Sequence, residues 1–209
     1  MSTEVLTPQI LQQLCSSDID AAVLLDTLSD LEVSAQVDTH ESELLVAYYC
    51  AYFFALFIHD DLNEARFLAK RIPKDVQANP SIQNAASLLK SLYSRSYPAI
   101  YTQLAAFSWP APVTALVERF AEAFRTRTCT LLSSAYTCIS PAAVAYYLGI
   151  EVSAGVSTQP WFVQSGWSID DAGMFITAPP AESSRTASKG DNDGRIHRLT
   201  ELVTHLTQG

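Results

Sequence analysis

The sequence has 209 residues, which is enough for one large domain or two small ones that share a continuous core. Because 48% of the residues are hydrophobic and only 17% are charged, most of the chain is expected to fold rather than stay disordered. The formal net charge of −9 makes DNA and RNA poor partners unless basic residues gather locally, and no such cluster is expected from the sequence.

The cysteines and the N-terminus are typical of an intracellular protein. Cys15, Cys50, Cys129 and Cys138 form no CxxC pair, and each lies in an apolar, helix-like context. They are therefore expected to be buried free thiols. Residues 1–10 lack a basic stretch followed by an apolar run, so no signal peptide is expected. The expected localisation is the cytoplasm and the nucleus.

Helical patterns dominate residues 8–127. Pro8 can begin one helix and Asp18 can cap a second. The apolar run at 44–58 is shorter than the roughly 20 residues that a bilayer span needs. It predicts a third helix that is apolar on nearly all sides and must be buried by its neighbours.

A fourth helix is expected after a break at residues 59–61. Asp61 and Glu64 have the spacing of a capping box, and Pro73 ends the helix. Four apolar side chains are expected to face the core: Leu62, Ala65, Phe67 and Leu68. Two more helices are predicted at 81–93 and 98–107. Successive antiparallel pairs of this kind predict a short stack of helical hairpins, as in α-solenoids.

Three further helices are predicted in the second half of the chain. The first is long and covers 113–139, with room for one break near Thr126. A short helix at 141–148 follows, starts at a Ser-Pro pair and is capped by Gly149. Another short helix is predicted at 152–164.

A β-hairpin is predicted over residues 167–177, where aromatic and β-branched residues flank an Asp-Asp-Ala-Gly turn. Helices followed by a hairpin in this order predict a winged helix. Between Arg127 and Arg185 there is no Lys, Arg or His, which leaves a nucleic-acid-binding winged helix as a less favoured alternative. The apolar strand residues Phe175 and Ile176 instead predict protein contacts through a sheet edge.

The C-terminal part is predicted to hold a linker and a docking helix. Residues 178–192 are rich in Pro, Ser, Lys, Gly and Asp and are expected to be flexible. Residues 193–206 return to helical spacing. One face of that helix carries the apolar stripe Ile196, Leu199, Leu202, Val203 and Leu206. A lone helix this short is marginal in water, so it needs a surface to dock against.

No catalytic motif is present: HExxH, the P-loop, GxSxG and the dinucleotide fingerprint are all missing. The acids and histidines at 40–43 and 59–61 could share a metal only if the ends of one helix met, yet about 30 Å separates them. We therefore expect no enzyme activity, no catalytic, cofactor-binding or metal-binding residues, and no cofactor.

Several sequence blocks carry a family resemblance. They are 56–73, 97–101 with Trp109, 131–139, 147–150, 166–167 and 198–203. Together, in order and spacing over residues 44–206, they resemble the family of the small eighth subunit of the COP9 signalosome. The chain departs from the family in its first forty residues, which do not align, and at Ala69, where the family tends to an aromatic residue.

The resemblance implies a mainly α fold: a PCI domain of TPR-like helical hairpins capped by a winged helix, then a C-terminal helix that enters a shared bundle. It implies a non-catalytic scaffold subunit of the COP9 signalosome, the complex that deneddylates cullin-RING ubiquitin ligases. The implied partners are other PCI subunits, with no nucleic acid and no membrane, and the zinc site belongs to a different subunit. Small PCI subunits of the proteasome lid or of a translation initiation factor are the alternatives.

The expected domain boundaries follow from these elements: 1–112 for the helical repeats, 113–177 for the winged-helix part, 178–192 for the linker and 193–209 for the C-terminal helix. The expected interface residues are Phe175, Ile176, Ile196, Leu199, Leu202, Val203 and Leu206.

Overall fold

The structure is a computed structural model that describes residues 6–16, 19–38, 42–150, 167–169 and 175–177. This part of the chain is mainly helical, as expected, with three short strands. In chain order its elements are α1 (Pro8–Ser16), α2 (Ala21–Asp38), α3 (Ser42–His59), α4 (Leu62–Arg71), α5 (Lys74–Gln77), α6 (Pro80–Tyr93), α7 (Tyr97–Ala106), the 3₁₀ turn η1 (Ala111–Val113), α8 (Thr114–Ala135), β1 (Cys138–Ile139), α9 (Pro141–Leu148), β2 (Trp167–Ile169) and β3 (Phe175–Thr177).

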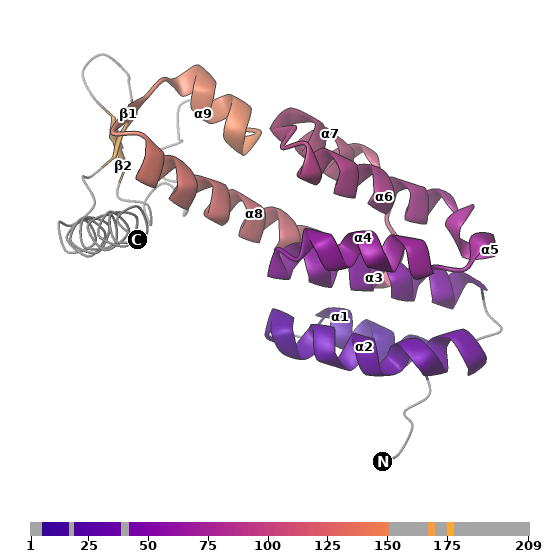
Figure 1. Cartoon of the computed structure of the whole chain (residues 1–209). Helices are drawn as coiled ribbons and strands as arrows, with labels where there is room; N and C mark the ends of the chain where they lie inside the picture. The colour runs from indigo at the N-terminus through magenta and orange to yellow at the C-terminus, as the bar shows by residue number, and fades with distance from the viewer. Residues whose placement is uncertain (1–5, 17–18, 39–41, 151–166, 170–174, 178–209) are drawn as a thin grey trace, which may run out of the picture.

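The helices before α8 lie in layers (Figure 1). α1 and α2 form one layer, α3 and α4 the next, and α6 and α7 a third, while α8 runs from α3 to the small sheet. The closest packing between elements is that of α2 on α3, of α8 on α3, and of α6 on α7. The mainly helical class is confirmed, while the assignment of these layers to TPR-like repeats stays a prediction.

α3 is the central core helix. Its residues 46–57 are all buried, so the expectation that neighbouring helices cover this run is confirmed. α3 is long and apolar enough to cross a membrane by length and composition, but 72% of it is buried inside the protein, as in the core helix of a folded domain. The hydroxyl of Tyr48 also donates to the carbonyl of Leu28 on α2, which satisfies a polar group inside the core.

Aromatic rings packed at steep angles fix α8 against α3. Phe54 on α3 contacts Trp109 edge to face, with ring centroids 4.9 Å apart, and contacts Phe120 on α8 at 5.9 Å. Phe57 lies 5.7 Å from the same Phe120 ring. Aromatic pairs in this geometry stabilise a fold by about 0.5–1.5 kcal/mol each beyond simple burial. The cluster therefore sets where α8 leaves the core.

The start of α4 forms half of the expected capping box. The carboxylate of Asp61 accepts from the backbone N–H of Glu64 at 3.0 Å, which satisfies one free donor of the first turn. The reciprocal bond is absent, because the Glu64 carboxylate pairs with Arg71 at 2.7 Å and the Asp61 N–H donates to the carbonyl of Leu56.

The expectation that Phe67 faces the core is wrong. Its side chain is 55% exposed, whereas Ala65 and Leu68 are buried. Residues three apart on a helix share a face, so Ala65 and Leu68 point to the core together and the intervening Phe67 turns away.

α8 ends earlier than expected and has no break at Thr126. Tyr136 is already extended, and the strand β1 takes Cys138 and Ile139 away from the helix. The hydroxyls of Ser133 and Ser134 donate to carbonyls of the preceding turn, a local bond common where helices stop.

α9 has the bounds predicted from its caps. The hydroxyl of Ser140 accepts from the N–H of Ala143, and Gly149 ends the helix with φ +61, a left-handed conformation that glycine adopts without strain. There is a second reason for glycine at this position: a Cβ at Gly149 would overlap Cδ2 of Tyr101.

The three strands form one antiparallel sheet in the order β1-β3-β2. The β2–β3 pairing confirms the hairpin expected over 167–177. The predicted helix at 152–164, the linker at 178–192 and the C-terminal helix lie outside the described residues. Asp18 does too, and α2 begins only at Ala21.

The described part has two apolar clusters, and α8 contributes residues to both. The larger extends from Leu6 to Phe120, and the smaller comprises Cys129, Leu132, Ile139, Val144, Leu148 and Trp167. In the smaller one, the indole N–H of Trp167 donates to the Ser133 hydroxyl. α8 is thus the element that joins the helical layers to the sheet, while the expected domain boundaries stay predictions.

Candidate interaction surfaces

Within the described residues, no group of three or more His, Cys, Asp or Glu side chains could hold a metal ion. Cys15, Cys50 and Cys129 are buried, as expected, and Cys15 and Cys50 are free thiols. Burial raises the pKa of Cys15 and of Cys50 to about 12, so both stay protonated at neutral pH and are poor nucleophiles. Cys138 differs from the expectation, because its position in the edge strand β1 leaves it exposed.

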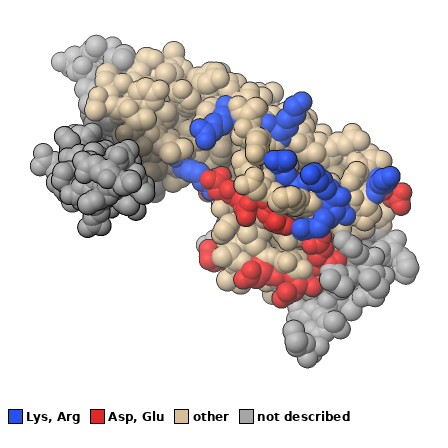
Figure 2. Space-filling view, in the orientation of Figure 1, with Lys and Arg blue, Asp and Glu red and all other residues tan. Residues whose placement is uncertain are grey.

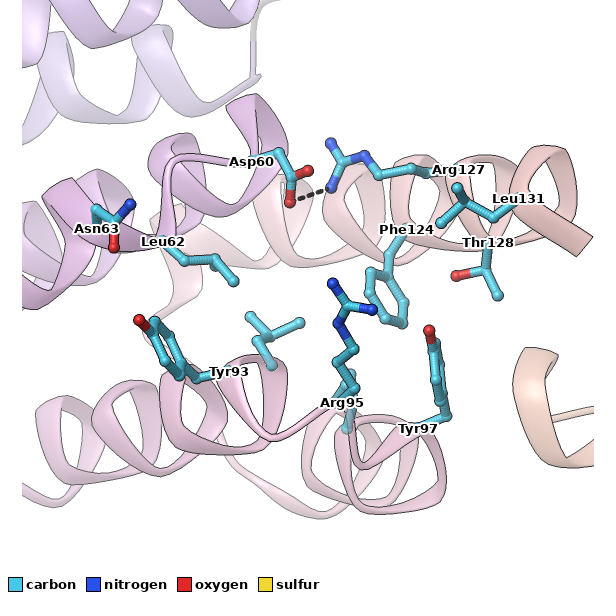
Figure 3. Close-up of a pocket in the computed structure, with 12 residues that line it drawn as sticks. Asp60, Leu62, Asn63, Tyr93, Arg95, Tyr97, Phe124, Arg127, Thr128 and Leu131 are labelled. Carbon is cyan, nitrogen blue, oxygen red and sulfur yellow. Dashed lines mark ion pairs between the residues drawn. The ribbon is translucent and has the colours of Figure 1, made fainter. Parts of the chain in front are cut away.

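The acidic turn after α3 has a structural partner. The guanidinium of Arg127 on α8 donates to the carbonyl of Ile58 at 2.8 Å and pairs with the Asp60 carboxylate at 3.0 Å. The dashed line in Figure 3 marks this ion pair. Asp60 therefore helps to hold α8 at the end of α3, and His59 beside it is exposed.

The strand that carries Phe175 and Ile176 is the centre of the sheet in the described part of the chain. Phe175 pairs with Ile139 on one side and Ile169 on the other, and Ile176 pairs with Cys138 and Ser168. Among the described strands, the unpaired edges therefore belong to β1 and β2. Contact of Phe175 and Ile176 with a partner stays a prediction, but an edge contact would use β1 or β2.

Exposed apolar side chains near β1 were missed by the sequence reading. Leu131 on α8 is 57% exposed, and Tyr136 and Tyr146, on either side of β1, are exposed as well. The adjacent Leu132 is buried, so hydrophobicity alone could not tell which leucine faces solvent. Three of the large apolar side chains that the described surface exposes thus come from α8, from α9 and from the segment that joins them.

The expected docking stripe lies outside the described residues. Its members Ile196, Leu199, Leu202, Val203 and Leu206 therefore stay predicted interface residues.

Basic side chains gather on the surface over α4 to α6, contrary to the expectation that no local cluster exists. Figure 2 shows them in blue, with acidic side chains alongside in red. The exposed basic residues from α4 to the turn after α6 are Arg66, Lys70, Arg71, Lys74, Lys90 and Arg95. Sequence spacing could not show it, because α4 and α6 come from separate layers that the fold brings together.

Part of this basic surface is neutralised by ion pairs. Arg71 bonds to Glu64 on its own helix at 2.7 Å and to Glu32 on α2 at 3.3 Å. Burial lowers the pKa of Arg71, but its bonds to the two carboxylates raise it more, so the net shift is upward. Arg71 therefore links α2 to α4 rather than offering a free charge to a ligand.

The fold and these surfaces define a class: a mainly helical protein that carries a small three-stranded antiparallel sheet and exposed apolar side chains. The model of the CSN8/PSMD8/EIF3K family matches residues 43–187, and the chain belongs to this family.

Named relatives extend the match over most of the chain. The COP9 signalosome complex subunit 8 of Danio rerio is 30% identical over 194 residues, 91% of this chain and 95% of that protein. The subunit 8 of Emericella nidulans is 32% identical over 155 residues, 70% of this chain and 73% of that protein. That of Arabidopsis thaliana is 27% identical over 186 residues, 88% of this chain and 90% of that protein. The resemblance read from the sequence blocks is confirmed.

Proposed function

We propose that this chain is a non-catalytic scaffold subunit of a COP9 signalosome, the complex that removes NEDD8 from cullin-RING ubiquitin ligases. The observation that carries the proposal is the match to relatives named as subunit 8 of that complex, one of which spans 91% of this chain. A structural role for the charged groups supports it, since Asp60 and Arg127 pair across two helices, as do Glu32 and Arg71.

The assembly contacts are proposed on two surfaces. α8, β1, α9 and the β2–β3 pair are the described parts of the proposed winged helix, in which the edge strand β1 follows the exposed Tyr136 along the chain and precedes the exposed Tyr146. An unpaired edge beside apolar side chains suits the sheet of a sister PCI subunit. The stripe at 196–206 is proposed to enter a helical bundle formed with those subunits.

Affinity purification of the tagged chain from native lysate, with mass spectrometry of the recovered proteins, tests the proposal. We expect the other signalosome subunits at near-equal amounts. Recovery of proteasome lid or initiation factor subunits without signalosome subunits would identify one of the alternatives instead. Localisation in the cytoplasm and nucleus is part of the proposal, and fractionation of the same cells checks it.

A further inference from the structure

A cavity of about 420 Å³ lies where α4, α6, α7 and α8 meet (Figure 3). This volume is in the range of about 300–1,000 Å³ that is typical of ligand pockets. Its lining is mixed: Leu92 and Ile100 are buried and Phe124 is half-buried, while charged and polar side chains such as Asp60 and Arg127 complete the wall. The cavity is partly open to solvent, and its lining residues Tyr93 and Leu131 are 54% and 57% exposed. It therefore offers an accessible recess with both apolar and charged walls.

Arg95 projects into this cavity from the turn between α6 and α7 (Figure 3). Within the part of the chain that the structure describes, its side chain has no hydrogen bond and no ion pair. The other arginine that lines the cavity, Arg127, is paired with Asp60. Arg95 is thus the uncompensated positive charge of the cavity wall.

The backbone conformation at Arg95 is one that usually carries glycine rather than a residue with a side chain. Arg95 has φ 54, a left-handed conformation at the end of α6. The N–H of Ser96 donates to the carbonyl of Ser91, which closes the helix with the bond pattern in which glycine is favoured. The N–H of Arg95 also donates to the carbonyl of Leu92 at 3.1 Å, and these two bonds stabilise the turn, but a left-handed conformation remains less favourable for arginine than for glycine. The pairing of strain with a free charge favours a role in binding.

A second cation lies beside the cavity. The guanidinium of Arg66 lies 5.5 Å from the ring centre of Tyr93, a lining residue. The ring of Tyr93 thus has Arg66 against it, while Arg95 projects into the cavity that Tyr93 helps to line. This arrangement suits a ligand that combines an apolar group with one or two negative charges.

The carboxylates near the cavity distinguish between classes of ligand. Asp60 lines the wall, and Asp61 and Glu64 follow it in the turn and first helical turn of α4. A nucleic acid carries a regular series of phosphates and would meet these acids along its length, whereas a short peptide can place a single carboxylate on Arg95. Charge therefore favours a peptide.

We propose that this cavity binds a short acidic segment of another polypeptide, which places a carboxylate on Arg95 and an apolar or aromatic side chain between Tyr93 and Leu131. The site differs from the sheet edge and the C-terminal helix, and it does not depend on the identity of the complex to which the chain belongs.

A peptide selection tests the proposal with the full chain. Random peptides of about a dozen residues are displayed on phage and selected on the immobilised protein, and the recovered peptides are synthesised with a fluorescein label. We expect them to share an acidic residue next to a large apolar or aromatic one. Their affinity, measured by fluorescence polarisation, should fall at least about tenfold in the variant Arg95→Gly, because a charge-assisted bond is lost.

The same variant separates binding from folding. Glycine relieves the left-handed strain, so Arg95→Gly should leave Tm unchanged or raise it by up to about 4 °C while binding is lost. Lys74→Ala, which removes one exposed positive charge away from the cavity, is the matched control and should bind the peptides normally. A structural role for Arg95 would instead lower Tm.

Four outcomes would overturn the proposal. One is a selection that gives no acidic consensus, and another is binding that Arg95→Gly leaves intact. An equal loss of binding in Lys74→Ala would show that only net charge matters. Tighter binding of a fluorescein-labelled oligouridine than of any peptide at physiological salt, lost in Arg95→Gly, would assign the site to nucleic acid.

Discussion

At the scale of single residues, Gly149 is the position where the fold depends most clearly on one side chain being absent. It ends α9 with φ +61 and lies against the ring of Tyr101, whose hydroxyl donates to the carbonyl of Tyr147 at 3.3 Å. Burial raises the pKa of Tyr101, more than the nearby Arg125 lowers it. These contacts join α7 to α9, and with them the helical layers to the smaller cluster.

Replacement of Gly149 by Ala should lower the free energy of unfolding by about 2–4 kcal/mol, the sum of left-handed strain and overpacking. A Cβ would meet Cδ2, Cγ and Cβ of Tyr101, which are close to its backbone and cannot swing away. Urea unfolding measures the loss. Because the two residues are in contact, Tyr101→Ala in the Gly149→Ala background should restore part of it. Independent, additive effects of the two substitutions would rule out the clash.

Thiol reactivity should distinguish the four cysteines. Only Cys138 is exposed among the cysteines, all of which are described. In the isolated native chain at pH 8, a chromogenic disulfide reagent should modify Cys138 quickly and the others only after unfolding. Cys138→Ser should remove the fast phase. A fast phase that persists in this variant would show that a buried thiol becomes accessible.

The buried thiols also predict a loss of stability in alkali. Burial raises the pKa of Cys15 and Cys50 to about 12, above their unfolded value of 9.0. Because the thiols ionise less readily in the folded than in the unfolded state, their contribution to the free energy of unfolding is fully present below pH 9. It is lost as the pH rises toward 12. Urea unfolding at a series of pH values should show this decline in the free energy of unfolding. The decline should be smaller in the variant Cys50→Ala. An equally steep decline in that variant would contradict the assignment.

At the scale of elements, α8 is the main structural link. Its first half packs on α3, its second half contributes Cys129 and Leu132 to the smaller cluster, and Arg127 fixes its middle to the end of α3. Arg127 acts through two bonds of different kinds. One reaches the backbone carbonyl of Ile58, and the other the largely exposed Asp60.

Removal of these two bonds should have unequal effects. Arg127→Leu should lower the free energy of unfolding by about 1–3 kcal/mol, since the Ile58 carbonyl loses a charged donor. Asp60→Asn should change it by less than about 1 kcal/mol, because exposed ion pairs contribute little. Thermal unfolding of both variants measures the difference. An effect of Asp60→Asn as large as that of Arg127→Leu would show that the ion pair is the main contribution.

Elements with local signals were predictable from the sequence, and those that depend on distant pairing were not. The bounds of α9 follow from Ser140 and Gly149, and the cap of α4 from Asp61. The predicted end of α8 was wrong because the next residues form β1, which pairs with β3 far along the chain. The cavity around Arg95 had no sequence signal, since its walls come from four separate helices.

At the scale of the whole molecule, charge is distributed unevenly. The net charge of −9 hides a basic surface over α4 to α6, where Arg71 is neutralised by Glu32 and Glu64. Arg95, in the turn after α6, has no such partner in the described part of the chain. The family could be recognised from the order and spacing of sequence blocks, which are visible along the chain without knowledge of the fold. The uncompensated charge of Arg95 could not be recognised in this way, because it depends on which helices the fold makes neighbours.

Assembly should depend on the C-terminal stripe. Replacement of both Leu199 and Leu202 by Asp should detach the chain from its complex, because each buried leucine contributes about 1.5–3 kcal/mol and a buried charge adds a desolvation penalty. Co-purification with sister subunits measures this, and Thr200→Asp, between the two, is a matched control for added charge. Undiminished recovery of the subunits with the double variant would refute the docking role.

The proposed role is tested most directly by release of NEDD8 from a modified cullin. Two samples are compared: the assembly recovered with the tagged chain from native lysate, and the recombinant chain alone. If the chain is a non-catalytic subunit of a deneddylating complex, the assembly should release NEDD8 and the chain by itself should not. An inactive assembly, or a recombinant chain that releases NEDD8 unaided, would contradict it.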